Sequence, residues 1–230
     1  MEVIANLHWI KGLFSNIFLW KDEEELILVD TGQPGDARRI SNYLSEIGKS
    51  VSDITSILIT HADYDHAGTV ATMHKQSGAP VFTSMKTAEL LVVGKSPEHM
   101  PGPIQFLLNT IFRYQPLPAS AIRVVDDGET ITDKSQWRLL ATPGHSPDHH
   151  SFWSPVHSLL FAGDALSTRG NQLKCSPKRN TADMAAARRS AMKLLLLTPA
   201  VFACGHGPPI HDHSSDQLFM LYRELEEQLP

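Results

Sequence analysis

The segment His61-Ala62-Asp63-Tyr64-Asp65-His66-Ala67-Gly68 directly follows a short apolar run at residues 54–60. That run has the length and composition of a buried β-strand, so the polar segment begins where the strand ends. Strand ends in layered α/β proteins meet along one edge of a sheet, where loops carry function. Two imidazoles and two carboxylates stand within six residues of this loop. They predict a metal site, because these groups are ligands of zinc, iron and manganese.

Three later loops repeat this arrangement. Residues 137–141 precede Thr142-Pro143-Gly144-His145, residues 158–161 precede Ala162-Gly163-Asp164, and residues 201–203 precede Cys204-Gly205-His206-Gly207. Together the four loops supply four histidines and three carboxylates, namely His61, His66, His145, His206, Asp63, Asp65 and Asp164. A catalytic zinc takes three protein ligands, so seven candidates favour two metal ions that share a carboxylate.

The remaining pattern predicts an α/β protein. Extended segments are expected at 3–10, 16–20, 25–30, 54–60, 80–83, 122–125, 130–132, 137–141, 151–153, 158–161 and 201–203, and helices at 36–47, 67–76, 86–93, 183–197 and 216–228. Strand-rich stretches followed by helices occur twice, which indicates two sheets covered by helices. Residues 1–230 show no repeat or linker and are expected to form a single domain.

Composition limits the partners. The 230 residues are 42% hydrophobic and 20% charged, and 20 Lys+Arg against 25 Asp+Glu give a net charge of −5. Because nucleic-acid binders usually carry a basic excess, we expect no nucleic-acid partner. Apolar runs such as residues 194–197 are far shorter than the roughly 20 residues that cross a bilayer, so no membrane partner is expected. A small-molecule substrate remains.

The compartment and the oligomeric state are less constrained. The sequence has only two cysteines and no signal-peptide pattern at its start, so we expect a cytoplasmic protein. The apolar stretch 104–114 has helical spacing and would pack on the core of its own chain or cap a cleft. Pairing with a second subunit in a homodimer is the third alternative.

The motifs H-A-D-Y-D-H-A-G, T-P-G-H-S-P, A-G-D-A and G-H-G, after Asp30-Thr31-Gly32, resemble the metallo-β-lactamase fold superfamily. The resemblance implies a four-layer αββα sandwich of two mixed sheets flanked by helices, with metals at one edge of the sheets. Within the superfamily, the chain is similar to stand-alone hydrolases near glyoxalase II and the quorum-quenching lactonases. By position, the resemblance gives the first metal His61, Asp63 and His145, gives the second Asp65, His66 and His206, and makes Asp164 the bridge.

Asp63 departs from the family pattern, because most members have a second histidine there. A carboxylate adds negative charge and shifts the preference toward iron or manganese. A zinc site of altered affinity, or a partly filled first site, is the alternative. We therefore expect two divalent metal ions, with zinc first and iron or manganese as alternatives.

Other residues are expected around the ligands. Asp30 would accept hydrogen bonds that hold the ligand loops together, and His149 would orient the loop of His145. Lys174, Lys178 and Arg179 follow Asp164, where relatives place substrate-binding residues, and would hold a carboxylate or phosphate. A solvated basic loop is the other interpretation.

The sequence thus predicts a metal-dependent hydrolase of a small ester, thioester or lactone. A hydroxide bridging two metals would attack the carbonyl carbon, and Asp65 or Asp164 would steer the proton. The alternatives are a diiron redox or oxygen-binding protein, a phosphodiesterase of the same fold, and a metal-binding protein without catalysis.

Overall fold

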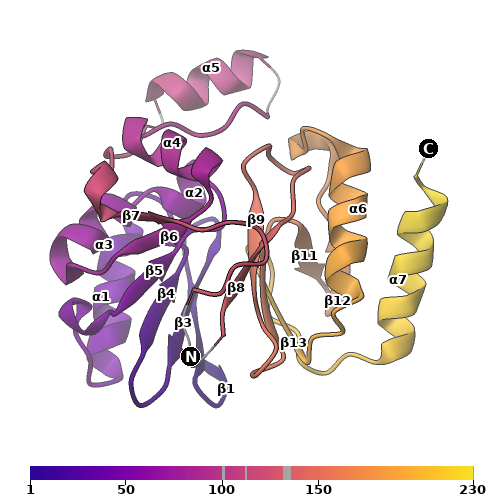
Figure 1. The fold of residues 1–230 in the computed structure, drawn as a ribbon, viewed down its shortest axis with the longest axis horizontal. Coiled ribbons are helices and arrows are strands. Elements are labelled where there is room, and N and C mark those ends of the chain that lie inside the picture. The colour runs from indigo at the N-terminus through magenta and orange to yellow at the C-terminus, as the bar shows by residue number, and fades with distance from the viewer. Residues whose placement is uncertain (100–101, 112, 132–135, 230) are drawn as a thin grey trace. The chain divides into compact units, whose positions relative to one another are not determined.

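The computed structural model describes residues 1–99, 102–111, 113–131 and 136–229 (Figure 1). The chain divides into two compact units. Unit 1 comprises Met1–Pro97 and Pro103–Val125, and unit 2 comprises Glu98–Gly102 and Asp126–Pro230. Both units combine β-sheet with α-helix, which confirms the predicted α/β class.

The described part of unit 1 forms a seven-stranded mixed sheet whose strands follow one another in chain order. The strands are β1 (Glu2–Ile4), β2 (Leu7–Lys11), β3 (Asn16–Lys21), β4 (Leu26–Val29), β5 (Ser56–Leu58), β6 (Val81–Thr83) and β7 (Ile122–Val124). Strands β1 to β4 pair antiparallel through short turns, whereas β4 to β7 pair parallel and are joined by longer connections. Parallel neighbours need such crossovers, and here helices provide them.

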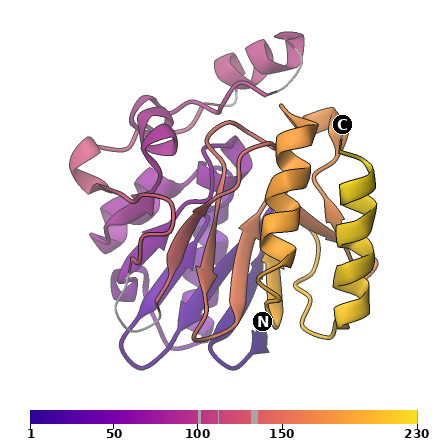
Figure 2. The same ribbon diagram turned by 45° about the vertical axis from the view of Figure 1, so that its right-hand side comes forward.

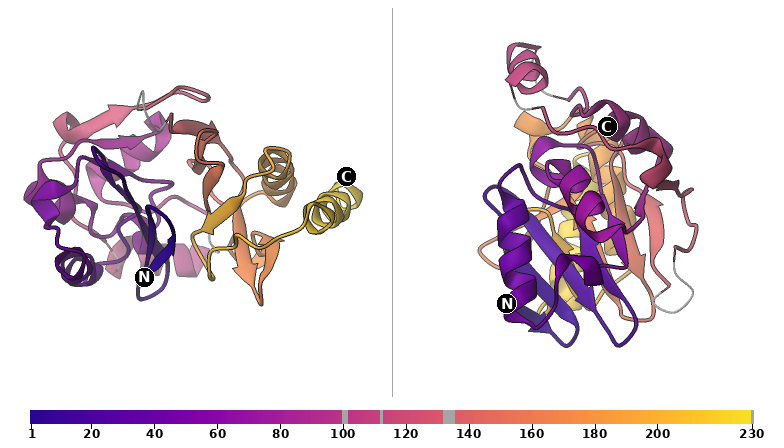
Figure 3. Two further views of the ribbon diagram at one scale, coloured as in Figure 1. Left: turned by 90° about the horizontal axis from the view of Figure 1, so that it is seen from below. Right: turned by 90° about the vertical axis from the view of Figure 1, so that its left-hand side faces the viewer.

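The helices of unit 1 are α1 (Asp36–Glu46), α2 (Tyr64–Ala67), α3 (Val70–Ser77), α4 (Met85–Val93) and α5 (Gly102–Ile111). Helix α1 buries Ile40 and Leu44, four residues apart on one face, in the same cluster as Leu28 and Ile57 of the sheet. Figure 3 shows α1 lying against the strands of this unit. Apolar residues at helical spacing therefore cover one face of the sheet.

Residues 136–229 of unit 2 form a four-stranded mixed sheet in the order β13-β10-β9-β8. Its strands are β8 (Arg138–Ala141), β9 (His150–Ser154), β10 (Leu159–Gly163) and β13 (Val201–Cys204). A hairpin of β11 (Leu166–Arg169) and β12 (Gln172–Cys175) follows β10, and the helices are α6 (Met184–Leu195) and α7 (Ser215–Glu227). Figure 2 shows α6 and α7 side by side in this unit.

A second hydrophobic cluster holds unit 2 together. Leu194 of α6 and Leu221 of α7 pack with Leu160 of β10 and Phe202 of β13. Side chains of this size contribute about 1.5–3 kcal/mol each when fully buried. The cluster thereby fixes the two parallel strands, β10 and β13, whose ends carry candidate ligands.

The structure differs from the predicted elements at a strand that is a hairpin and at a hairpin that was not predicted. The single strand expected at 3–10 is a hairpin, because the chain turns at Ala5 and Asn6, where Asn6 has a φ of 71°. The β11–β12 hairpin was missed, although its turn contains Gly170 and Asn171, both at positive φ.

Two expectations reach beyond the described part of the chain. Helix α5 confirms the helix within 104–114, but the side chains at 104, 107, 108 and 111 that would decide between core, cap and interface lie outside the described residues. Residue 132 of the strand expected at 130–132 lies outside them too, and Thr130 forms an isolated bridge with Arg138.

Among the described residues, no helix combines the length and the apolar character that crossing a membrane requires.

Candidate metal centre

In unit 1, four of the predicted ligands follow strand β5. His61 and His66 are fully buried, with ring centroids 4.2 Å apart. The Nε2 atom of His61 lies 3.3 Å from Oδ2 of Asp63, and the Nε2 atom of His66 lies 3.9 Å from Oδ2 of Asp65. Each imidazole thus turns its Nε2 atom toward a carboxylate.

Asp30 orients these two imidazoles through their Nδ1 atoms, directly for His66 and by way of Thr60 for His61. Its Oδ2 atom lies 2.8 Å from Nδ1 of His66, and its carboxylate accepts hydrogen bonds from the backbone N–H and the hydroxyl of Thr60. The Thr60 oxygen lies in turn 2.9 Å from Nδ1 of His61. Because the hydroxyl proton goes to Asp30, the His61 Nδ1–H donates to Thr60, and Nε2 of both rings keeps its lone pair.

The turn at Asp30-Thr31-Gly32 is fastened to the ligand loop. Asp30 has a φ of 54°, and the Thr31 N–H donates to the His66 carbonyl at 2.7 Å. Gly68 lies against this turn, since a Cβ atom there would come within 2.7 Å of the Gln33 backbone. A glycine at position 68 is therefore required for close contact between the two loops.

In unit 2, strand directions bring three predicted ligands to one edge of the sheet. Strands β10 and β13 are parallel, and β9 runs antiparallel to both β10 and β8. Strands β8, β10 and β13 therefore end at the same edge, and His145, Asp164 and His206 follow these ends. The buried Asp164 carboxylate lies between the two histidines. Its Oδ2 atom is 3.6 Å from Nε2 of His145 and 3.1 Å from Nε2 of His206.

Neighbouring groups fix this arrangement. His145 is held through Nδ1, which lies 3.0 Å from the hydroxyl of Ser176. His149, predicted to orient the His145 loop, accepts the backbone N–H of Asp164 on Nε2 at 2.8 Å. The other nitrogen of His149 lies 2.9 Å from the hydroxyl of Thr142, so this ring joins the loops after β8 and β10.

Sequence reasoning missed two residues here. Ser176 follows β12 in a hairpin that was itself not predicted, and a single serine has no sequence signature. The sequence gives no indication of a role for His99, yet the centroid of its ring lies 5.0 Å from the centroid of the His145 ring.

The three predicted substrate residues are exposed and lie in different surroundings. Lys178 and Arg179 stand in a short 3-10 helix (Lys178–Asn180) within a loop fastened to His145 at both ends. Ser176 contacts the His145 ring, and the Ala182 N–H donates to the His145 carbonyl at 3.0 Å.

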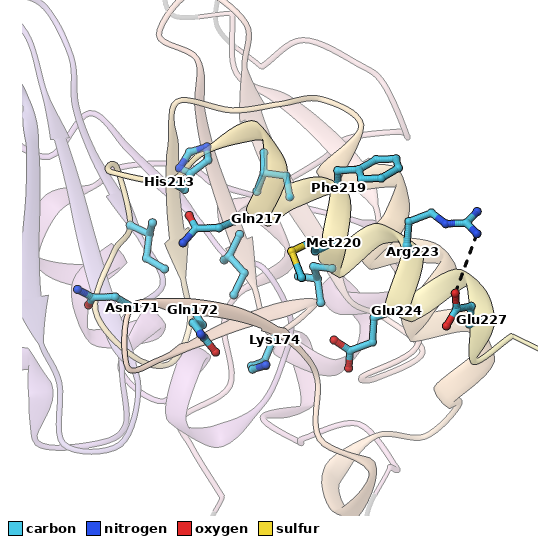
Figure 4. Close-up of a pocket in the computed structure, with 14 residues that line it drawn as sticks. Asn171, Gln172, Lys174, His213, Gln217, Phe219, Met220, Arg223, Glu224 and Glu227 are labelled. Atoms are coloured by element: carbon cyan, nitrogen blue, oxygen red, sulfur yellow. Dashed lines mark ion pairs between the residues drawn. The ribbon is translucent and has the colours of Figure 1, made fainter.

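Lys174, by contrast, lines a cavity of about 480 Å³ between the β11–β12 hairpin and α7. Figure 4 shows Lys174 on the hairpin side and Met220 and Arg223 on the helix side. None of the seven predicted metal ligands lines this cavity. The structure thus separates Lys174 from the other two cations of its cluster.

Both cysteines lie in surroundings that disfavour the thiolate. Burial raises the pKa of Cys175, and burial together with the nearby Asp164 carboxylate raises that of Cys204. A thiol that stays protonated is a poor nucleophile, so neither cysteine is favoured as a nucleophile.

Comparison with known proteins identifies the family of the chain. Residues 10–206 match the Metallo-beta-lactamase superfamily. The chain belongs to this superfamily. The resemblance drawn from the motifs is thereby confirmed, and the hydrolase class and metal binding that come with the family are supported.

Among curated relatives, the probable metallo-hydrolase YflN of Bacillus subtilis (strain 168) is 25% identical over 91% of this chain and 86% of its own. The hydroxyacylglutathione hydrolase of Idiomarina loihiensis is 30% identical over 68% of this chain. That match spans 49% of the relative, so the chain covers about half of the enzyme it resembles.

Solved structures share the fold. A mutant metallo-beta-lactamase from Cronobacter sakazakii superposes with a TM-score of 0.72 at 23% identity, over 90% of this chain and 79% of that chain. A metallo-beta-lactamase family protein from Thermus thermophilus gives a TM-score of 0.68 at 23% identity, over 98% and 81%. These likenesses show the mixed α/β fold that the motifs implied.

Proposed function

We propose that this protein is a metal-dependent hydrolase that uses two divalent ions to cleave a small ester, thioester or lactone. One observation carries the proposal. The Oδ2 atom of Asp164 lies within 3.6 Å of the Nε2 atoms of both His145 and His206. A carboxylate between two imidazoles is the arrangement expected of a ligand shared by two ions.

The donor set fits divalent metals of the zinc, iron and manganese group. Metal-binding histidines usually engage their second ring nitrogen with a carboxylate, hydroxyl or carbonyl group. His61, His66 and His145 each do so through Nδ1, with Thr60, Asp30 and Ser176 as partners. Their Nε2 atoms are thus oriented for ligation before any ion binds.

We assign the ligands as the motifs suggested. His61, Asp63 and His145 would hold one ion, Asp65, His66 and His206 the other, and Asp164 both. Ions held there acidify water and polarise a carbonyl oxygen. We propose zinc as the metal, with iron or manganese as alternatives because the Asp63 carboxylate shifts the preference of the site toward these ions.

The chain's own groups would complete the reaction. Asp65 is a candidate to move the proton, because its side chain is 27% exposed while its ligand neighbour His66 is buried. Asp164 is the second candidate. Lys178 and Arg179 would bind an anionic group of the substrate, since their loop is anchored on His145.

The relatives favour an acyl substrate. The Idiomarina loihiensis relative is a hydroxyacylglutathione hydrolase, and YflN is a probable metallo-hydrolase. Thioesters therefore come first in a substrate screen, followed by lactones and simple esters. The small-molecule substrate, the absence of nucleic-acid and membrane partners and a cytoplasmic location remain predictions, and a homodimer remains one of the alternatives for the stretch 104–114.

The proposal is tested by metal content and metal-dependent hydrolysis. Protein purified without chelator or added metal should contain about two zinc, iron or manganese ions per chain by plasma mass spectrometry. Removing the ions should abolish hydrolysis of thioesters, lactones and esters, and adding them back should restore it. Hydrolysis that survives complete removal of metal would refute the proposal.

Asp164 gives the sharpest variant. Asp164→Ala removes the shared carboxylate and should lower the metal content to about one ion or less. Asp212→Ala is a matched control in the same unit, because Asp212 is exposed and contacts only His211 among the ion pairs described for it. Two ions retained in Asp164→Ala would contradict the shared role.

A further inference from the structure

His99 lies against one of the candidate metal ligands of its own unit. Its ring and the ring of His145 are 5.0 Å apart between centroids and inclined by 52°. A ring nitrogen of His99 lies within 4.8 Å of a ring nitrogen of His145. His99 is half-buried, so it sits at the border of the interior.

The segment that carries His99 is held in place by its surroundings. Residues 98–102 belong to unit 2, although the chain on either side belongs to unit 1. Just before this segment, the Ser96 hydroxyl accepts the backbone N–H of Tyr64 at 3.0 Å. The Tyr114 hydroxyl contacts the carbonyl oxygens of Lys95 and Ala62, each at 3.0 Å. Within unit 1, Lys95 and Ser96, which shortly precede His99, are therefore tied to the loop that contains Asp63 and Asp65.

The chemistry around His145 shows what a second imidazole would do there. Nδ1 of His145 is engaged with Ser176, and Nε2 faces Asp164. Two imidazoles at neighbouring positions on one ion, with bonds of about 2.0–2.1 Å, have their ligand nitrogens about 3 Å apart. Binding of one ion by both rings therefore requires their ring nitrogens, which lie within 4.8 Å of each other, to approach by up to about 2 Å.

We propose that His99 is a further ligand of the ion that His145 binds. With it, the candidate ligands that unit 2 offers to that ion are His99, His145 and the shared Asp164. The inference rests on the proposed function only in that the chain binds metal, and it names a ligand outside the strand-end motifs.

The test compares His99→Ala with a matched control. His157 is also a half-buried histidine of unit 2 whose ring contacts an aromatic ring, that of Trp137 at 6.2 Å. It precedes β10, whereas Asp164 follows that strand, so the five residues of β10 separate it from the ligands. Metal-free wild type, His99→Ala and His157→Ala are titrated with Co²⁺ in competition with a chromophoric chelator, and their visible absorption spectra are recorded.

Loss of an imidazole should weaken one of the two Co²⁺ sites at least about tenfold and change its absorption bands, since even partners outside the coordination shell affect affinity about 10- to 100-fold. His157→Ala should match wild type in both respects. Equal thermal unfolding of the metal-free proteins would show that His99→Ala folds normally.

Other outcomes separate the two proposals. If wild type binds Co²⁺ and His99→Ala has the same affinities and spectrum, the ligand role of His99 is overturned while the proposed function stands. A changed KM without a change in affinity or spectrum would also overturn it, because His99 would then contact substrate instead. If wild type binds no metal, both proposals fail.

Discussion

Replacing Asp30 by Asn should impair metal binding without removing a ligand. Asn has nearly the same size and tolerates the positive φ of position 30, which is 54°. Its carbonyl oxygen can still accept the Thr60 N–H, now at 2.9 Å from Oδ1. The NH₂ group then takes the place of Oδ2, which lies 2.8 Å from Nδ1 of His66 and 2.9 Å from the Thr60 hydroxyl.

That exchange turns an acceptor into a donor. The amide can donate to His66 only if Nδ1 carries no proton, so the proton moves to Nε2. The Thr60 hydroxyl keeps an acceptor, because the amide carbonyl oxygen takes the place of Oδ1, which lies 3.1 Å from it, so His61 should keep its tautomer. The His66 imidazole would then present an N–H where the metal requires a lone pair.

The loss should be about 10- to 100-fold in metal affinity, the usual effect of changing such a partner. This corresponds to about 1.4–2.8 kcal/mol. Zinc affinity is measured by chelator competition, and the tautomers of His61 and His66 are read from their ¹⁵N chemical shifts in the metal-free protein.

Asp36→Asn is the matched control. Asp36 is a fully buried carboxylate of the same unit that accepts the backbone N–H groups of Leu13 and Gln33. It contacts none of the predicted ligands in the hydrogen bonds described for it and acts on Asp65 only through its charge, so its replacement should lower zinc affinity less than Asp30→Asn does. Wild-type affinity in Asp30→Asn, or an equal loss in Asp36→Asn, would refute the tautomer argument.

Three further predictions concern stability. Gly144→Ala should lower the free energy of unfolding by about 3 kcal/mol, because φ is 138° and a Cβ atom would strike the Ala187 backbone. Its control, Gly48→Ala, has a positive φ but open space around it and should lower the free energy of unfolding by only about 1–2 kcal/mol. Equal losses of the two variants in denaturant titrations would contradict the predicted clash. Burial lowers the pKa of His8, so the unfolded chain binds the proton more readily and stability should fall as the pH drops below about 6.5. Metal-free wild type should therefore lose up to about 1.4 kcal/mol per pH unit more than His8→Gln in this range, and parallel curves would count against it. Removing the metal should lower Tm, by the equivalent of about 2.7 kcal/mol where free ion stands at 100 times its Kd, and an unchanged Tm would argue against binding to the folded state.

Strand-end motifs made much of this site predictable from sequence. His145, Asp164 and His206 each follow an apolar run, and parallel or alternating strand directions are enough to bring such ends to one edge. The residues that orient the ligands were harder to find. Asp30 was expected because it stands in a loop of the motif set, whereas Ser176 contacts His145 from 31 positions away and has no local signal.

The missed hairpin has a different cause. Exposed and half-buried residues alternate along strand β12, so no apolar run marks this strand in the sequence. The Gly170 and Asn171 pair was the available signal, and it gains meaning only when both flanking segments are recognised as extended. His99 was overlooked because a proline-rich segment carries it, and neither periodicity nor spacing relates that segment to the loop of His145.

In the loop from Ser176 to Ala182, different residues orient His145 and face the solvent. It reaches His145 through one hydroxyl and through the backbone N–H of Ala182, which any residue except proline offers. Inside it, the Asn180 N–H and the Thr181 hydroxyl both close back on the Pro177 carbonyl. The exposed residues at positions 178 and 179 can therefore be substituted without a change in the contacts that orient the His145 imidazole. If Lys178 and Arg179 bind substrate as proposed, substrate preference can change along this loop without a change in the orientation of His145.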